Sequence, residues 1–133
     1  MEVVMSGIRH GIPPAQWDAA KREAKDILIA RAKLRGKIAY SELVERLTTV
    51  RFEAHNPRLN QLLDDISSEE DAAGRGMLSA IVVHKNDDMF PGDGFFELAK
   101  CLGRDVQNKL SREKAGILEM NKIHDRYANK KFP

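Results

Sequence analysis

The sequence has a single cysteine, few aromatic residues and no long apolar run. Because Cys101 is its one cysteine among 133 residues, neither an intramolecular disulfide nor a cysteine-ligated zinc framework can form. No stretch reaches the roughly 20 apolar residues that a membrane-spanning helix needs. The first five residues, MEVVM, lack the basic start and apolar stretch of a signal peptide. These absences predict a cytoplasmic protein without a membrane partner, in which Cys101 is a small buried hydrophobe.

The composition is typical of one folded domain. Hydrophobic residues make up 42% of the chain and charged residues 32%, which excludes wholesale disorder. The length predicts a single domain over residues 1–133. Within it, residues 1–12 are expected to form a flexible arm and residues 129–133 a frayed tail.

Charge is unevenly distributed along the chain. Residues 51–100 carry ten acidic against five basic side chains, whereas the segments on both sides of them are basic. Two basic ends can present a positive face to a polyanion, or they can pair with the acidic middle inside one fold. Charge alone does not choose between these arrangements.

Helical periodicity is clearest in three segments. A helix is predicted from Pro14 to a stop at Gly36, and a second one from Pro57 with Asn56 as its cap. A last helix is predicted from Ser111. The apolar positions expected on the buried faces are Trp17, Ala20, Ala24, Ile27, Leu28 and Leu34 in the first, Leu59, Leu62, Leu63 and Ile66 in the second, and Ile117, Met120, Ile123 and Tyr127 in the last.

The remaining segments are shorter. Residues 37–40 suit a brief strand, with Ser41 as the cap of the helix after it. Residues 67–76 are acidic and interrupt the second apolar stripe, and residues 77–84 are apolar and β-branched enough to predict a strand buried on both faces. Residues 85–94 read as a polar loop and residues 95–102 as a short helix. The order predicts an α+β, mostly helical fold: a winged-helix-like domain with a small sheet and extra N- and C-terminal helices.

Two resemblances add to this interpretation. Residues 34–43, LRGKIAYSEL, resemble the Gly-Lys-Val-x-x-Tyr-Gly-x-Ile-Ala stretch that opens the helix-turn-helix of alkylguanine DNA alkyltransferases and of the inert alkyltransferase-like proteins. The resemblance implies that residues 57–66 form a recognition helix for the minor groove. Residues 78–84 fall where that family carries Pro-Cys-His-Arg-Val, but residues 79–82 are Ser-Ala-Ile-Val, so no alkyl acceptor is present. Residues 74–83 and 91–96 also resemble a motif of short uncharacterised bacterial proteins, which implies no activity.

The leading hypothesis is a non-enzymatic module that binds duplex DNA. Asn and Gln can read adenine edges, while Arg and Lys neutralise phosphates. Asp64 and Asp65 would repel a phosphate backbone, which limits the expected contact to the first turn of the helix from Pro57. The candidate contacts are Lys37, Tyr40, Arg51, Arg58, Asn60 and Gln61.

Two alternatives stay open. One is a protein-interaction or adaptor domain that contacts another protein or a second copy of itself. The other is a small enzyme that uses His84 and the acidic loop, although no nucleophile or orienting carboxylate stands at a diagnostic spacing from His84. Residues 91–96 are either a structural turn or a wing or partner loop with an anion site at the following helix. We assign no catalytic residue, metal ligand or cofactor.

Overall fold

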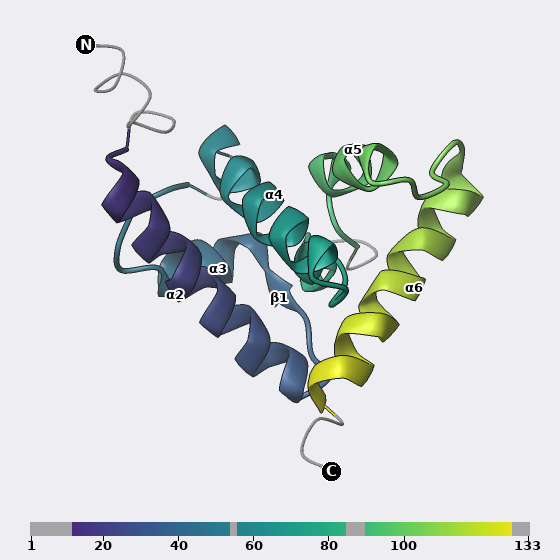
Figure 1. The fold of residues 1–133 in the computed structure, drawn as a ribbon, viewed down its shortest axis with the longest axis horizontal. Helices are drawn as coiled ribbons and strands as arrows, with labels where there is room; N and C mark the ends of the chain where they lie inside the picture. The colour runs from purple at the N-terminus through teal and green to yellow at the C-terminus, as the bar shows by residue number, and fades with distance from the viewer. Residues whose placement is uncertain (1–11, 54–55, 85–89, 129–133) are drawn as a thin grey trace.

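The computed structural model describes residues 12–53, 56–84 and 90–128, and these are mostly helical with one small sheet (Figure 1). The elements in chain order are α2 (Pro14–Lys33), β1 (Ile38–Ala39), α3 (Tyr40–Arg46), α4 (Pro57–Ala72), the 3-10 helix η1 (Leu78–Ile81), β2 (Val82–Val83), α5 (Asp93–Cys101) and α6 (Lys109–Ala128). The predicted α+β, mostly helical class is therefore confirmed.

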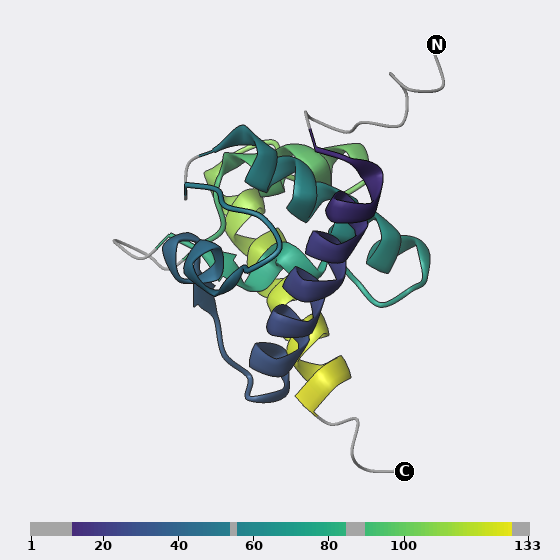
Figure 2. The same ribbon diagram turned by 90° about the vertical axis from the view of Figure 1, so that its left-hand side faces the viewer.

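The two long helices enclose the rest of the domain. Figure 1 shows α2 and α6 approaching each other at their C-terminal ends, with α4 between them and α5 near the start of α6. The His124 ring, 2.9 Å from the Gly36 carbonyl, and an Arg35–Asp125 ion pair join these two ends. Figure 2 places α3 behind α2 as it is seen in Figure 1. The core lies between α2, α4, η1 and α6.

Helix α2 confirms the first predicted helix. It begins at Pro14, whose missing N–H costs nothing in a first turn, and Trp17 is fully buried on its inner face. The prediction for Leu34 is wrong, because the helix ends at Lys33 and Leu34 is 78% exposed. The arm prediction is wrong at Ile12, which is buried against the core. Residues 1–11 and 129–133 lie outside the described residues.

Helix α4 begins as predicted but is longer than expected. The Asn56 side chain accepts a hydrogen bond of 2.8 Å from the Arg58 N–H, and the predicted apolar stripe is buried. The interruption predicted after Ile66 is wrong, because the helix continues to Ala72. Its polar residues Ser67 and Glu70 face inward and have hydrogen-bond partners there.

The strand predicted over residues 77–84 is wrong for most of its length. Residues Leu78–Ile81 form a 3-10 helix, and the strand is limited to Val82–Val83. The hydroxyl of Ser67 accepts a hydrogen bond of 2.9 Å from the Ser79 N–H and donates one of 2.6 Å to the Ser79 hydroxyl. A side chain of α4 thus satisfies a backbone group that a strand would pair with a neighbour. The predicted burial is confirmed for residues 77–83 and wrong for His84, which is exposed.

The sheet consists of two short strands. Strand β1 pairs in parallel with β2, with Ile38 opposite Val82 and Ala39 opposite Val83. Ser41 is not a cap, because α3 begins one residue earlier and Ala39 holds the cap position without a side-chain hydrogen bond. Part of the loop expected as a wing, residues 85–89, lies outside the described residues.

Helices α5 and α6 complete the core. The short helix predicted near Phe95 is confirmed, but α6 begins at Lys109 because the Asn108 side chain accepts a hydrogen bond of 2.9 Å from the Ser111 N–H. Ile117 is 49% exposed, and Cys101 is exposed rather than buried, so both burial predictions are wrong. Within the described ranges, no helix is long and apolar enough to cross a membrane.

Candidate nucleic-acid interface

The first two turns of α4 present polar side chains to solvent. Arg58, Asn60 and Gln61 are all exposed, as is Arg51 in the segment that leads into the helix. Neither the Arg51 nor the Arg58 guanidinium forms an ion pair with any residue that the structure describes. Four of the six candidate contacts are therefore accessible to a ligand in solution.

Tyr40 and Asn60 meet at the start of α5. The Gly92 N–H donates a hydrogen bond of 2.9 Å to the Tyr40 hydroxyl. A Cβ atom on Gly94 would lie 3.4 Å from Cγ of Asn60, so the amide of α4 rests against the first turn of α5. Burial raises the pKa of the Tyr40 phenol, as do the charges of Asp64 and Asp93, against the opposing effect of the Gly92 hydrogen bond. Tyr40, which follows β1 and begins α3, thus holds the loop of residues 91–94 in place through this hydrogen bond.

His84 closes the same corner from the end of β2. It is exposed, and its ring centroid lies 5.0 Å from that of Tyr40. A Cβ atom on Gly92 would lie 2.9 Å from Nε2 of His84, a distance that real Cβ atoms essentially never show. Glycine at position 92 therefore lets the loop approach the histidine closely. This contact keeps the loop of residues 91–94 close to the end of β2.

Lys37 lies in the turn before β1 and is half-buried. Its carbonyl accepts a hydrogen bond of 2.6 Å from Arg31, which also forms an ion pair of 2.6 Å with Glu42. The backbone at Lys37 is thus held by α2 and α3 together.

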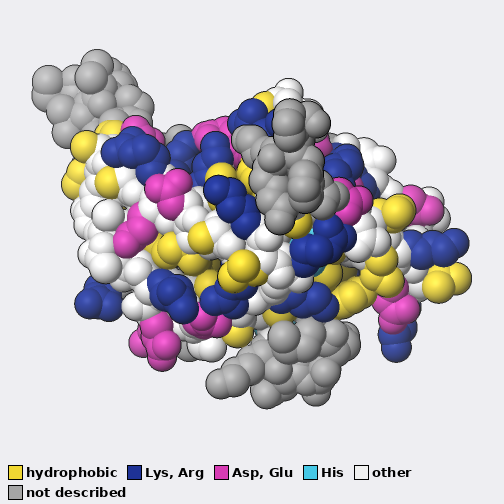
Figure 3. All heavy atoms as spheres, turned by 90° about the horizontal axis from the view of Figure 1, so that it is seen from below, with side chains coloured by type: hydrophobic (Ala, Val, Ile, Leu, Met, Phe, Trp, Pro, Cys, Tyr) yellow, Lys and Arg dark blue, Asp and Glu magenta, His cyan; other side chains and the backbone are white. Residues whose placement is uncertain are grey.

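The acidic residues later in α4 are engaged inside the fold. Asp65 accepts a hydrogen bond of 2.8 Å from Trp17, and Glu69 forms an ion pair with Lys21. Glu70 is bonded to Lys25, Arg75 and Tyr127, and Asp71 pairs with Arg104 at 2.6 Å. The acidic middle of the sequence therefore pairs largely with cations and donors of its own domain. On the face shown in Figure 3, basic and acidic side chains alternate, and neither kind forms one continuous patch.

Asp64 differs from these neighbours because it forms no ion pair with a cation among residues 12–53, 56–84 and 90–128. Burial raises its pKa to about 6, and the negative charges of Asp65 and Glu97 raise it as well. A carboxyl group with this pKa is still mostly ionised at pH 7 and becomes protonated as the pH falls through 6, where it repels a phosphate backbone less than an ordinary aspartate would.

We expect Asp64→Asn to stabilise the protein by about 1 kcal/mol at pH 8. Because the folded pKa lies above the unfolded one, the protonated form stabilises the fold below about pH 4, and this contribution is lost as the pH rises through 6. The figure is discounted because Asp64 is only half-buried. Urea unfolding at pH 4 and pH 8 tests it, with the exposed Asp26→Asn as control. A gain that is equal at both pH values would contradict the assignment.

A metal centre finds no support in the described part of the chain. Residues 12–53, 56–84 and 90–128 contain no group of three His, Cys, Asp or Glu side chains placed to hold an ion. Two residues of the acidic loop considered in the enzyme hypothesis, Asp87 and Asp88, lie outside the described residues. The third, Asp93, is paired with Arg112 at 2.7 Å.

The chain matches no family model, no curated protein and no solved structure.

Sequence reasoning missed two residues beside this corner. Arg112 and Lys109 lie at the start of α6 and line a cavity together with the loop of residues 91–94. The only signal in the sequence was the glycine-rich run of residues 91–96, which singled out one wall of that cavity and not the other.

Proposed function

We propose that this chain is a small non-enzymatic module that binds duplex DNA through the first turns of α4. One observation carries the proposal: along α4, the exposed polar and basic side chains lie at the start, and the acidic ones that follow are paired within the fold or, at Asp64, half-buried. The helix N-terminus adds a partial positive charge that favours phosphate.

In this proposal the roles divide between the helix and the segment before it. Asn60 and Gln61 read base edges, since side-chain amides can pair with adenine. Arg58 and Arg51 contact phosphates on either side, with Lys37 at the margin. Tyr40 positions the start of α5 and does not contact DNA directly, because its hydroxyl is engaged by Gly92.

The order of elements supports a winged-helix-like interpretation. A long helix, a short strand and two helices precede the second strand, as the resemblance to the alkyltransferase family implies. The parallel pairing of β1 with β2 ties the start of α3 to the segment after α4, so these helices are held as one unit. The candidate wing in this proposal is the loop of residues 85–94, of which residues 85–89 lie outside the described residues.

Fluorescence anisotropy with a labelled random duplex tests this function. We expect affinity to fall steeply between 50 and 200 mM salt, because phosphate contacts release counterions. Arg58→Glu should weaken binding at least tenfold. Lys114→Glu makes the same change of charge at an exposed position of α6, a helix that Figure 1 shows away from the start of α4, and should have less than a twofold effect.

Two outcomes would overturn the proposal. Absence of binding at low salt, where electrostatic attraction is strongest, would exclude DNA as the ligand. Equal losses in Arg58→Glu and Lys114→Glu would indicate general attraction to a polyanion instead of docking by α4.

A protein-binding role is the second candidate, and α6 favours it. Leu110 and Leu118 are each 65% exposed, and Ile117 is 49% exposed, so the outer side of the helix presents apolar surface to water. Sedimentation velocity over a concentration series tests self-association. A dimer that is lost in Leu118→Ser would support this role, and a monomer throughout would count against a second copy as the partner.

A further inference from the structure

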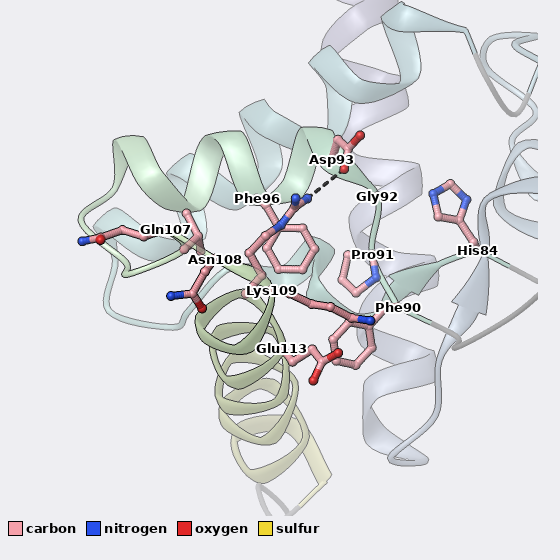
Figure 4. A pocket seen from close by; sticks show the side chains of 12 residues that line it. His84, Phe90, Pro91, Gly92, Asp93, Phe96, Gln107, Asn108, Lys109 and Glu113 are labelled. Carbon is pink, nitrogen blue, oxygen red and sulfur yellow. Dashed lines mark hydrogen bonds and ion pairs between the residues drawn. The ribbon is translucent and has the colours of Figure 1, made fainter.

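A cavity lies between the start of α5 and the start of α6. Its volume is about 580 Å³, which is within the range of small-molecule sites. Phe90, Pro91 and Phe96 supply apolar and aromatic walls, and Figure 4 shows charged and amide side chains around them. Gly116 of α6 lies beside both rings, since a Cβ atom there would be in ordinary van der Waals contact, 3.4 Å from Phe90 and 3.7 Å from Phe96.

Arg112 is held in place beside this cavity. Its guanidinium lies 4.5 Å from the centroid of the Phe96 ring and forms one ion pair of 2.7 Å with Asp93. A guanidinium has five N–H donors in a rigid plane, and within the described residues Asp93 engages one terminal nitrogen. The stacked group therefore keeps donors for a ligand and needs little reordering to bind one.

Lys109 adds a second cation. Figure 4 shows its side chain extending toward Pro91 and Phe90, across the mouth of the cavity. It is exposed and forms no ion pair with any residue in the described ranges. An ammonium group in this position can reach a charge bound between the two helices.

The start of α5 contributes further positive potential. Its cap residue, Gly92, lines the cavity and has no side chain to satisfy the first N–H groups of the helix. The start of α6 differs, since Asn108 caps it through Ser111. Among the described residues that line the cavity, Asp93 and Glu113 are acidic, and Asp93 is already paired with Arg112.

We propose that this cavity binds a small organic anion: a planar aromatic ring that carries a phosphate monoester. The ring lies against Phe90 and the edge of Phe96, and the phosphate is held by Arg112, Lys109 and the first turn of α5. A phosphate fits better than a carboxylate because two cations, Arg112 and Lys109, line the same cavity as the uncapped start of α5. The inference does not depend on DNA binding.

Three probes separate the parts of such a ligand. Titration calorimetry is done with 1-naphthyl phosphate, with 1-naphthol, which lacks the anion, and with inorganic phosphate, which lacks the ring. We expect 1-naphthyl phosphate to bind at least tenfold more tightly than either of the others. Comparable affinity for 1-naphthol would show an apolar crevice, and comparable affinity for inorganic phosphate would show a simple anion site. Either result would overturn the proposal.

Matched variants locate the site. Lys109→Gln should weaken the binding of 1-naphthyl phosphate about threefold to tenfold, as the loss of one charged contact predicts. Asp93→Asn should tighten it severalfold, because it removes a competing carboxylate from Arg112. Lys114→Gln makes the same change as Lys109→Gln on the exposed side of α6 and should have no effect.

Lys109→Gln is expected to lower the affinity and Asp93→Asn to raise it, so the two variants test the site in opposite directions. Thermal unfolding of each variant confirms that the fold is retained, which is expected because all three side chains are exposed. Equal affinity of Lys109→Gln and Lys114→Gln, or weaker binding in Asp93→Asn, would overturn the assignment of the phosphate to this cavity. Neither result would bear on the DNA experiment, which depends on Arg58.

Discussion

Replacing Glu70 with alanine is expected to lower the free energy of unfolding by about 3 kcal/mol at pH 7. The Glu70 side chain is 1% exposed and accepts hydrogen bonds from Arg75 at 2.9 and 2.8 Å and from the Tyr127 hydroxyl at 2.7 Å. Lys25 lies 2.8 Å away. Breaking a buried ion pair costs roughly 3–5 kcal/mol, and the lower end applies because Lys25 and Arg75 can be rehydrated.

The effect of this substitution should depend on pH. Burial raises the pKa of Glu70, but the hydrogen bonds from Arg75, Lys25 and Tyr127 lower it by more than burial raises it, so the pKa falls to about 2. Because the folded pKa lies below the unfolded one, the stabilisation is complete above about pH 4.5 and is lost as the pH falls toward 2. The difference in stability between the wild type and Glu70→Ala should therefore narrow below pH 4.5.

Urea unfolding followed by circular dichroism measures both effects. Glu69→Ala is the matched control, because the neighbouring side chain is 59% exposed and forms one ion pair with Lys21. An exposed pair of this kind contributes about 0.5 kcal/mol. Similar losses in the two variants, or a loss in Glu70→Ala that is unchanged at pH 3, would contradict the role assigned to Glu70.

Gly76→Ala is expected to cost about 2–3 kcal/mol of stability. Gly76 has φ +95, which lies outside the conformations that other residues adopt readily. A Cβ atom there would lie 2.7 Å from Cδ of Lys122 and 3.2 Å from Cδ1 of Ile123. The lysine chain can swing aside, but Ile123 is fully buried, so part of the strain stays.

A second glycine in the same turn isolates the backbone contribution. Gly74 has φ +80, and a Cβ atom there would meet nothing within 4 Å. Gly74→Ala should therefore cost only the strain of the left-handed backbone, about 1 kcal/mol. Thermal and urea unfolding of both variants measure the difference. Equal costs would show that the contact with Ile123 adds nothing.

The parts of the fold that sequence predicts well are those with local signals. The cap at Asn56, the proline at position 57 and a complete apolar stripe define the start of α4 and its buried face without reference to other segments. Helix α2 is predicted for the same reasons, from Pro14 onward. Such signals operate within a few residues, so one sequence is enough to read them.

The errors arise where contacts with distant segments determine the conformation or the burial of a residue. Residues 77–84 have the composition of a buried strand, yet periodicity cannot separate a buried strand from another buried segment. The interaction that favours the 3-10 helix is between Ser67 and Ser79, and its geometry exists only after α4 has formed. The exposure of Ile117 likewise depends on where α6 packs, which its own spacing does not determine.

The candidate interface shows the same division. Arg58, Asn60 and Gln61 were expected on the outer side of α4 and are exposed. The prediction that Asp65 repels a phosphate backbone did not include its hydrogen bond with Trp17, which lies 48 residues earlier in the chain. The hydrogen bond between Tyr40 and Gly92 joins residues 52 positions apart, and neither local sequence predicts it.

The enclosure of η1 has a consequence for biosynthesis. Residues 77–83 are buried among α2, α4 and α6, and Ile123 and Tyr127 of α6 belong to the same core. A ribosome makes α6 after the segment that it covers, so in the nascent chain this apolar run emerges before its last wall exists. During that interval the segment lacks the cover that α6 gives it in the folded domain, and a chain cut before Lys109 would keep it without that cover.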